Sequence, residues 1–317
     1  MSLWVHDLAA RTALGASDTA FAAARARLSR PAPLGLEVED PLGEPTELAG
    51  HPVVGAYGFA GLGRRVALAR PALDEVLARL PAPASAQRVG LVVAGPGVGG
   101  LSRPLSEAWR FHVVRDLGVA ADPEDPSGPL TRGDAAFVQA LDEAQALLAS
   151  RSVDRVVVVA VDAGCEPSRV EALEGADRLK SPDNPVGLAP GDAAVVLLVG
   201  AAPTGALAQL GPWASAGAPA QAAARGPACA WVLSSLNGEE PSARAFADVL
   251  VRWRSEQVWH PARAFGDTFG AHGALGVAWA VVAFRRGYAP APICAAFAGD
   301  AEGATAVWVR AMSAGRG

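Results

Sequence analysis

Short, continuous apolar runs alternate along this chain with segments whose apolar residues recur at helical spacing. The runs predict buried strands, and the periodic segments predict helices. Such alternation is typical of a layered α/β architecture rather than a helical bundle or a β-sandwich. The expected strands are Leu3–Ala9, Arg88–Ala94, Asp154–Val161, Ala193–Val199, Ala230–Ser234, Ile293–Phe297 and Thr305–Arg310. The expected helices are Ser17–Ser29, Arg70–Leu80, Ser106–Leu117, Asp134–Ser150, Ser242–Trp253 and Thr268–Arg286.

The order of these elements predicts two α/β halves, residues 1–200 and 201–317, each ending in a pair of strands. This repetition suggests a duplicated architecture, although no repeat of individual residues is evident. Two segments interrupt the pattern. Pro31–His51 is rich in Pro, Gly and Glu and is expected to be a loop. Ala201–Pro227 is expected to contain one strand and otherwise to link the halves.

The amino-acid composition excludes several classes of protein. The chain has 317 residues, 51% hydrophobic and 19% charged, with a formal charge of −5. These values are typical of a globular protein and disfavour disorder, collagen and a nucleic-acid-binding surface. Lys180 is the only lysine, and it lies in no phosphate-binding G-x-x-x-x-G-K-[ST] motif. A Walker-type nucleotide site and a Schiff-base lysine are therefore excluded.

Cysteine and histidine positions give no metal or disulfide pattern. The chain has an odd number of cysteines, and they are widely spaced: Cys165, Cys229 and Cys294. The histidines show no metal-ligand spacing such as H-E-x-x-H. We therefore expect no metal and a reducing compartment. The longest apolar stretches fall short of the roughly 20 residues that span a bilayer, and the N-terminus lacks a signal-peptide pattern. We expect a soluble, cytoplasmic protein.

A glycine cluster follows the strand Arg88–Ala94. Gly95–Gly100 fits the dinucleotide-binding pattern G-x-G-x-x-G. Pro96, however, removes a backbone N–H where a pyrophosphate needs donors. We therefore expect no dinucleotide cofactor, and no other cofactor is indicated.

Five short segments occur in the order and spacing of one known superfamily. They are Arg11–Gly15 in the first turn, Val161-Asp162-Ala163 after a strand, Leu188–Ala194, Gly266–Gly273 and the glycine-rich Phe297–Ala306. With them the chain resembles β-ketoacyl synthase-like proteins of the thiolase-fold superfamily over nearly its whole length. The resemblance implies an α/β, thiolase-like fold in which two duplicated α/β halves form a layered αβαβα arrangement.

The resemblance also implies where catalytic residues would lie. Condensing enzymes of this fold need a cysteine nucleophile at a helix N-terminus, where the helix dipole and free N–H groups stabilise the thiolate. They also need two histidines, or a histidine and an asparagine. This chain has Asp134, Asn237 and Asp267 at the three matching landmarks. Since all three positions differ, the resemblance predicts a pseudo-enzyme without a catalytic triad.

His272 is the histidine nearest to these landmarks. It lies about one helical turn beyond Asp267, so the two side chains can pair only if the helix start is irregular. A packed or solvated helix histidine is the favoured interpretation, and His272 is kept as a candidate pocket residue. Cys165 has no histidine or cation close in sequence, so we interpret it as a structural cysteine.

Three hypotheses for function remain open. The first is a non-catalytic scaffold or adaptor that binds a protein partner. Similar degenerate proteins are encoded beside secretion-spike and effector genes, so the resemblance implies effector loading in type VI secretion. The second is a chain-length-factor-like partner of an active ketosynthase in fatty-acid or polyketide-type biosynthesis, with an acyl-carrier protein as a further partner.

The third hypothesis is an acyl-transfer or hydrolytic enzyme that uses Asp134, Asn237, Asp267 and His272 in new roles. A dimer, either homodimer or heterodimer, is the default in this superfamily. The chain-length-factor hypothesis further predicts a dimer surface around the strand after Gly90 and an apolar tunnel. Neither nucleic acid nor a membrane is expected as a partner.

Overall fold

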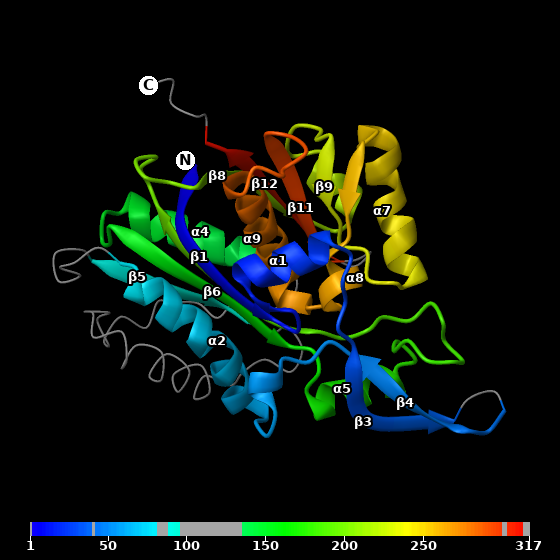
Figure 1. Cartoon of the computed structure of the whole chain (residues 1–317). Coiled ribbons are helices and arrows are strands. Elements are labelled where there is room, and N and C mark those ends of the chain that lie inside the picture. Colours follow the sequence, from blue (N-terminus) through cyan, green and yellow to red (C-terminus); the bar gives the residue numbers. More distant parts are fainter. Residues whose placement is uncertain (1, 40–41, 81–87, 96–134, 300–302, 313–317) are drawn as a thin grey trace.

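The computed structural model describes all residues except 1, 40–41, 81–87, 96–134, 300–302 and 313–317 (Figure 1). Its main sheet contains ten strands: β1 (Leu3–Thr12), β2 (Gly15–Ala16), β5 (Val89–Ala94), β6 (Arg155–Ala163), β7 (Asp192–Gly200), β8 (Ala208–Ala216), β9 (Trp231–Leu233), β10 (Gln257–Trp259), β11 (Ile293–Gly299) and β12 (Ala304–Ala311). A separate hairpin pairs β3 (Ala32–Glu39) with β4 (Pro45–Gly50). The expected strands are thus all present.

The described helices pack around this sheet. The α-helices are α1 (Ser17–Arg25), α2 (Gly61–Ala78), α4 (Ala136–Ala149), α5 (Pro167–Gly175), α6 (Pro219–Ala223), α7 (Glu240–Trp253), α8 (Pro261–Phe265) and α9 (His272–Arg285). Two short 3-10 helices are η1 (Val54–Ala56) and η3 (Phe269–Ala271). The expected helix Ser106–Leu117 lies outside the described residues.

Strand pairing repeats along the sheet, whose order is β10-β9-β11-β12-β8-β1-β7-β6-β5. In the first half, β5 is parallel to β6, and β7 is antiparallel to both β6 and β1. In the second half, β9 is parallel to β11, and β12 is antiparallel to both β11 and β8. The two sets meet where β1 pairs antiparallel with β8. The duplicated architecture is therefore confirmed, while the boundary between residues 200 and 201 stays a prediction.

Alternating side chains divide the core into layers. On β6, Val156 and Val158 belong to the central core with α4 and α9, whereas Val157 and Val159 belong to an outer core with α2. On β11, Ala296 belongs to the central core and Phe297 to a second outer core with α6 and α7. Because strand side chains alternate between faces, each half of the main sheet is covered on both sides.

The central helices lie between the two halves of the sheet. α4 contacts β5, β6, β8 and β12, and α9 contacts β1, β7, β11 and β12. α2 covers one outer face and α7 lies on the other side of the molecule (Figure 1). The predicted αβαβα arrangement of a thiolase-like fold is therefore confirmed.

The helix α9 is apolar around its whole circumference, and all residues from His272 to Ala283 are buried. A helix of this kind is stable only when other elements enclose it completely. Gly276 allows the closest approach to the sheet, since a Cβ there would lie 3.0 Å from the Cβ of Ala296. The expected helix Thr268–Arg286 begins later than predicted, because the 3-10 helix η3 precedes it.

Two expectations need correction, and some short elements were not predicted. Pro31–His51 is not a loop: it forms the hairpin β3–β4, whose half-buried Leu34, Leu36 and Val38 pack on the cluster that contains Val170 and Leu173 of α5. The helix expected at Arg70–Leu80 begins at Gly61 and contains Pro71. The short elements β10 and α8 were not predicted, because neither is long enough to show a period.

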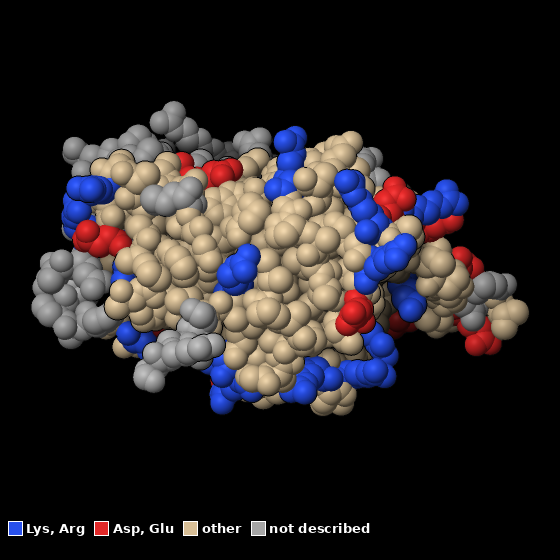
Figure 2. Space-filling model, turned by 90° about the horizontal axis from the view of Figure 1, so that it is seen from above, with Lys and Arg blue, Asp and Glu red and all other residues tan. Residues whose placement is uncertain are grey.

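Charged side chains are distributed around the face seen from above. Figure 2 shows them mainly along its rim, around a middle that is largely uncharged. The described part of this face lacks the continuous basic stripe that is typical of nucleic-acid binding. Among the described residues, no helix is both long and apolar enough to cross a membrane.

Candidate functional site

The segment Pro190-Gly191-Asp192 enters β7 and forms the floor of the candidate site. The Asp267 amide donates to Ala189 O over 2.7 Å, and the Gly191 amide donates to Asp267 O over 2.8 Å. A side chain at Gly191 has no room, because its Cβ would lie 2.0 Å from Phe265 O. This glycine therefore lets the residues before η3 pair with the start of β7.

Asp192 anchors this floor and is completely buried. Its Oδ2 accepts hydrogen bonds from Arg64 Nη2 at 2.6 Å and from the Val53 amide at 3.2 Å. Its Oδ1 accepts the Cys165 amide at 3.0 Å. One carboxylate thus joins α2, the segment before η1, and the turn after β6 to the start of β7.

Asn237 and Asp267, the residues at two of the three landmarks, have their side chains in contact. Asn237 Nδ2 donates to Asp267 Oδ2 and to Glu239 Oε2, each over 2.8 Å. Asn237 Oδ1 accepts the Glu239 amide at 3.1 Å. The Asn237 amide group therefore uses both of its N–H donors within the protein.

Arg178 completes this cluster from the loop after α5. Its guanidinium makes two hydrogen bonds to the Glu239 carboxylate, of 2.8 Å and 2.7 Å. Burial acts to raise the pKa of Glu239, but the hydrogen bonds and charge of Arg178, with the bond from Asn237, outweigh it and hold the pKa below its usual range. Arg178, Glu239 and Asn237, with Asp267, form what we call the amide–carboxylate cluster.

Asp267 also fixes the start of η3. Its Oδ1 accepts the Phe269 amide at 2.8 Å. Phe269 has a φ of 44°, which is uncommon for a residue with a side chain. The Arg169 guanidinium lies 3.8 Å from the centre of the Phe269 ring, a cation–π contact, and also binds Asp162 Oδ1 at 2.8 Å. These contacts hold the unusual backbone conformation in place.

The described hydrogen-bond partner of His272 is not a member of the amide–carboxylate cluster. It is buried, and its Nε2 lies 3.1 Å from Ser234 O, a carbonyl that accepts the hydrogen bond. Nε2 therefore carries a hydrogen. The Ser234 hydroxyl in turn bonds His260 Nδ1 over 2.8 Å. The structure thus brings Asn237 and Asp267 together and gives His272 a separate partner, whereas Asp134 lies outside the described residues.

Around Asn237 and Asp267 the amide–carboxylate cluster presents carboxylate acceptors, while the Arg178 guanidinium directs its donors to Glu239. A condensing site must offer N–H donors to a developing oxyanion. Here two carboxylates, those of Glu239 and Asp267, flank an amide whose donors are already engaged. Such an arrangement fixes loops and repels anions.

All three cysteines are free and buried. Burial, with the charge of Asp192, raises the pKa of the Cys165 thiol well above its ordinary value, and burial raises that of Cys229 to about 11. Neither thiol is therefore activated as a nucleophile. Within the described ranges, no group of three or more His, Cys, Asp or Glu side chains is placed to hold a metal ion.

Sequence reasoning missed Arg178 and Arg169 as members of this region. Arg178 is 61 positions from its partner Glu239, so no local pattern connects them. Glu239 lies two residues after the landmark Asn237, but it was not singled out from the sequence. The signal that did identify the region was the resemblance at Leu188–Ala194 and Gly266–Gly273.

Comparisons with known proteins agree on the fold. No protein-family model and no curated protein matches this chain. Solved structures match along nearly its whole length. A β-ketoacyl synthase from Burkholderia phymatum has 14% identity and a TM-score of 0.69, covering 98% of this chain and 100% of that chain.

Two further structures show the range of similarity. A structure of the ketosynthase ApeO in complex with its chain length factor ApeC, from Xenorhabdus doucetiae, contains a chain with 16% identity and a TM-score of 0.66; the match covers 98% of this chain and 98% of that chain. An oxazolomycin ketosynthase domain from Streptomyces albus has 13% identity and a TM-score of 0.74, covering 99% of this chain and 75% of that domain. The chain therefore has the thiolase-like fold of ketosynthases and chain length factors.

Proposed function

We propose that this chain is a non-condensing subunit with the ketosynthase fold that acts by binding a protein partner, and that the partner is an active ketosynthase. The observation that supports this proposal best is the amide–carboxylate cluster. Asn237 has no free N–H donor, and Asp267 places a carboxylate where a condensing enzyme needs a neutral or cationic donor. The chain would then resemble a chain length factor in its role.

The charge of the cluster also argues against decarboxylative condensation by this chain. The reaction brings a malonyl carboxylate to the site and develops negative charge on a thioester oxygen. Both anions would meet the carboxylate of Asp267, whose hydrogen bonds among the described residues come from the neutral Asn237 amide group and the Phe269 backbone amide, whereas the Arg178 guanidinium binds Glu239. Like charges at hydrogen-bond distance raise the energy of the transition state instead of lowering it.

Structural neighbours support a protein partner in particular. They include a ketosynthase with its chain length factor and a type II PKS acyl-carrier protein in complex with its ketosynthase. None of the structures named here is a secretion protein, and the type VI secretion role stays a prediction based on the sequence resemblance. The acyl-transfer or hydrolytic role has no observation in its favour beyond the presence of polar side chains.

The proposal predicts a stable complex. The tagged chain is co-expressed with each ketosynthase of its host, and the mixture is analysed by size-exclusion chromatography with light scattering. We expect a complex with one ketosynthase, and no turnover of malonyl thioester by the chain alone. Capture of secretion-spike or effector proteins instead of a ketosynthase would favour the adaptor role, and turnover by the chain alone would contradict both.

A nucleophile alone is not expected to restore condensation. In Asp134→Cys the new thiol lacks donors for the oxyanion, since Asn237 and Asp267 are unchanged. Loss of one such donor typically costs about 10²–10³-fold in rate. We therefore expect Asp134→Cys to decarboxylate a malonyl thioester no faster than the wild type does, as measured by the release of carbon dioxide. The triple variant Asp134→Cys/Asn237→His/Asp267→His serves as the comparison, and decarboxylation by Asp134→Cys alone would contradict the assignment of the site.

A further inference from the structure

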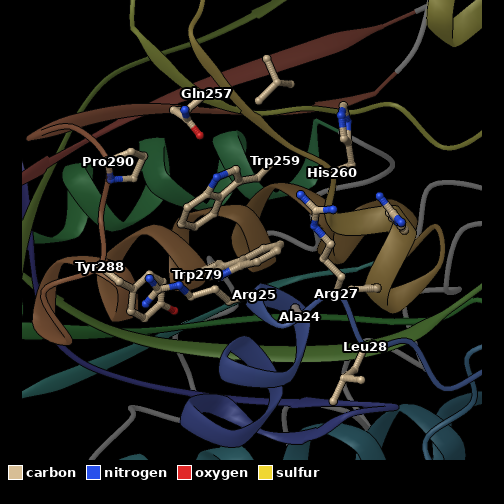
Figure 3. A pocket seen from close by; sticks show the side chains of 13 residues that line it. Ala24, Arg25, Arg27, Leu28, Gln257, Trp259, His260, Trp279, Tyr288 and Pro290 are labelled. Carbon is tan, nitrogen blue, oxygen red and sulfur yellow. The ribbon is translucent and has the colours of Figure 1, made fainter.

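A cavity of about 580 Å³ opens between the C-terminal ends of α1 and α9, the edge strand β10 and the helix α8 (Figure 3). This volume lies in the range of small-molecule sites, roughly 300–1,000 Å³. None of the residues that line the cavity belongs to the amide–carboxylate cluster. The cavity is therefore a separate feature that the proposed function does not use.

The wall of the cavity is cationic. Arg25, Arg27 and Arg263 line it, and no Asp or Glu does. Among the described residues, none of the three arginines forms an ion pair, although Arg25 also lies 4.4 Å from the centre of the Tyr288 ring. Asp18, which lines the adjoining groove together with Arg25, is already held by Arg285 and Arg286. Guanidinium groups without carboxylate partners are suited to bind an anion.

His260 adds little to this charge. Burial, together with the charge of Arg263, lowers its pKa below the ordinary value. The imidazole is therefore neutral near pH 7, with Nδ1 bonded to Ser234 Oγ at 2.8 Å. The positive potential of the cavity comes from its arginines.

The other wall is aromatic. Trp259 lies 5.1 Å from Trp279 and 6.1 Å from Tyr288, centre to centre, and its ring is within 24° of parallel to Tyr288. Figure 3 shows these three rings grouped on the side of the cavity that Arg25 also borders. Flat aromatic surfaces of this kind stack on planar rings of ligands.

Two buried polar groups in this wall have no hydrogen-bond partner in the part of the chain that the structure describes. Trp279 is 4% exposed, and its Nε1 makes no hydrogen bond; the Tyr288 hydroxyl is also buried and unpaired. The two groups are neighbours, but neither makes a hydrogen bond of normal geometry to the other. A buried N–H without an acceptor is costly, and a bound ligand that offers an oxygen or ring nitrogen removes that cost.

We propose that this cavity binds a small planar anion, of the class of a nucleoside phosphate. The ring of the ligand lies against Trp259 and Tyr288 and accepts a hydrogen bond from Trp279 Nε1. Its phosphate groups bind Arg25, Arg27 and Arg263. Each part of the wall thus has a matching part of the ligand.

Calorimetric titration tests the proposal with three probes. ADP carries both the ring and the charge, adenosine carries only the ring, and inorganic phosphate carries only the charge. We expect ADP to bind with a Kd below about 1 mM and at least about tenfold more tightly than either of the others. Equal binding of ADP and adenosine, or no binding of ADP, would overturn the proposal.

Variants at the exposed rim locate the site. Arg263→Gln and Gln257→Glu, which introduces an acid into the lining, are each expected to weaken ADP binding about tenfold or more. Arg252→Gln, at an exposed arginine of α7 outside the cavity, is the matched control and should leave the Kd unchanged. Circular dichroism establishes that each variant is folded. Equal effects of Arg263→Gln and Arg252→Gln would place the ligand elsewhere and overturn the proposal.

Discussion

Replacement of Arg64 by methionine is expected to lower the free energy of unfolding by about 3–5 kcal/mol, because it leaves the buried carboxylate of Asp192 without its cation. Arg64 and Asp192 are bonded over 2.6 Å, and their side chains are 5% and 0% exposed. Two backbone amides, of Val53 and Cys165, still bind the carboxylate in the variant. They cannot neutralise its charge, so most of the desolvation cost remains.

The measurement is chemical denaturation at pH 7, compared with two further variants. Arg70→Met removes an exposed pair with Asp74 on the same helix, α2, and is expected to cost at most about 1 kcal/mol. Arg64→Met/Asp192→Asn removes both charges and is expected to regain part of the stability lost in Arg64→Met. If Arg64→Met and Arg70→Met were equally stable, the ion pair would not anchor the floor of the site.

The sheet was predictable because most of its strands are continuous apolar runs. β6 and β7 are buried on both faces, and such strands need no alternation of polar residues. The hairpin β3–β4 escaped prediction although Leu34, Leu36 and Val38 alternate with exposed positions. Their signal was hidden by proline, glycine and glutamate, and the hairpin is stabilised by contacts with α5 that lie far away in sequence.

The candidate site was predictable only in part. The segments that carry Asn237 and Asp267 were located by resemblance, and the two side chains do meet. What they bond to was not predictable, because Arg178 reaches Glu239 from another loop. The cavity beside β10 gave no sequence signal at all, since its arginines and aromatic residues come from four elements.

The connection between the two regions runs through Ser234. Its carbonyl accepts the hydrogen bond of His272, and its hydroxyl bonds His260 at the wall of the cavity. Ser234 follows β9 directly, and Asn237 lies three residues further on.

Acidification is expected to destabilise the fold through His51. This residue is buried, its Nδ1 has no hydrogen-bond partner, and burial lowers its pKa from 6.5 to about 4. Between these two pH values the unfolded chain binds a proton at His51 that the folded chain does not, so stability falls as the pH falls. The contribution is complete above pH 6.5, and about 3 kcal/mol of it is lost by pH 4.

His51→Asn isolates this effect, because asparagine does not titrate. We expect the variant to be less stable than the wild type at pH 7, where it has lost packing, but to lose about 3 kcal/mol less between pH 7 and pH 4. His6 and His260, whose pKa values are also lowered mainly by burial, are present in both proteins and cancel in the difference. Urea denaturation at several pH values measures both curves. Parallel curves would mean that His51 is protonated as readily in the folded chain as in the unfolded one. A difference confined to this range would show that folding favours a neutral imidazole at His51, whose backbone pairs with Pro190 and Asp192 at the floor of the site.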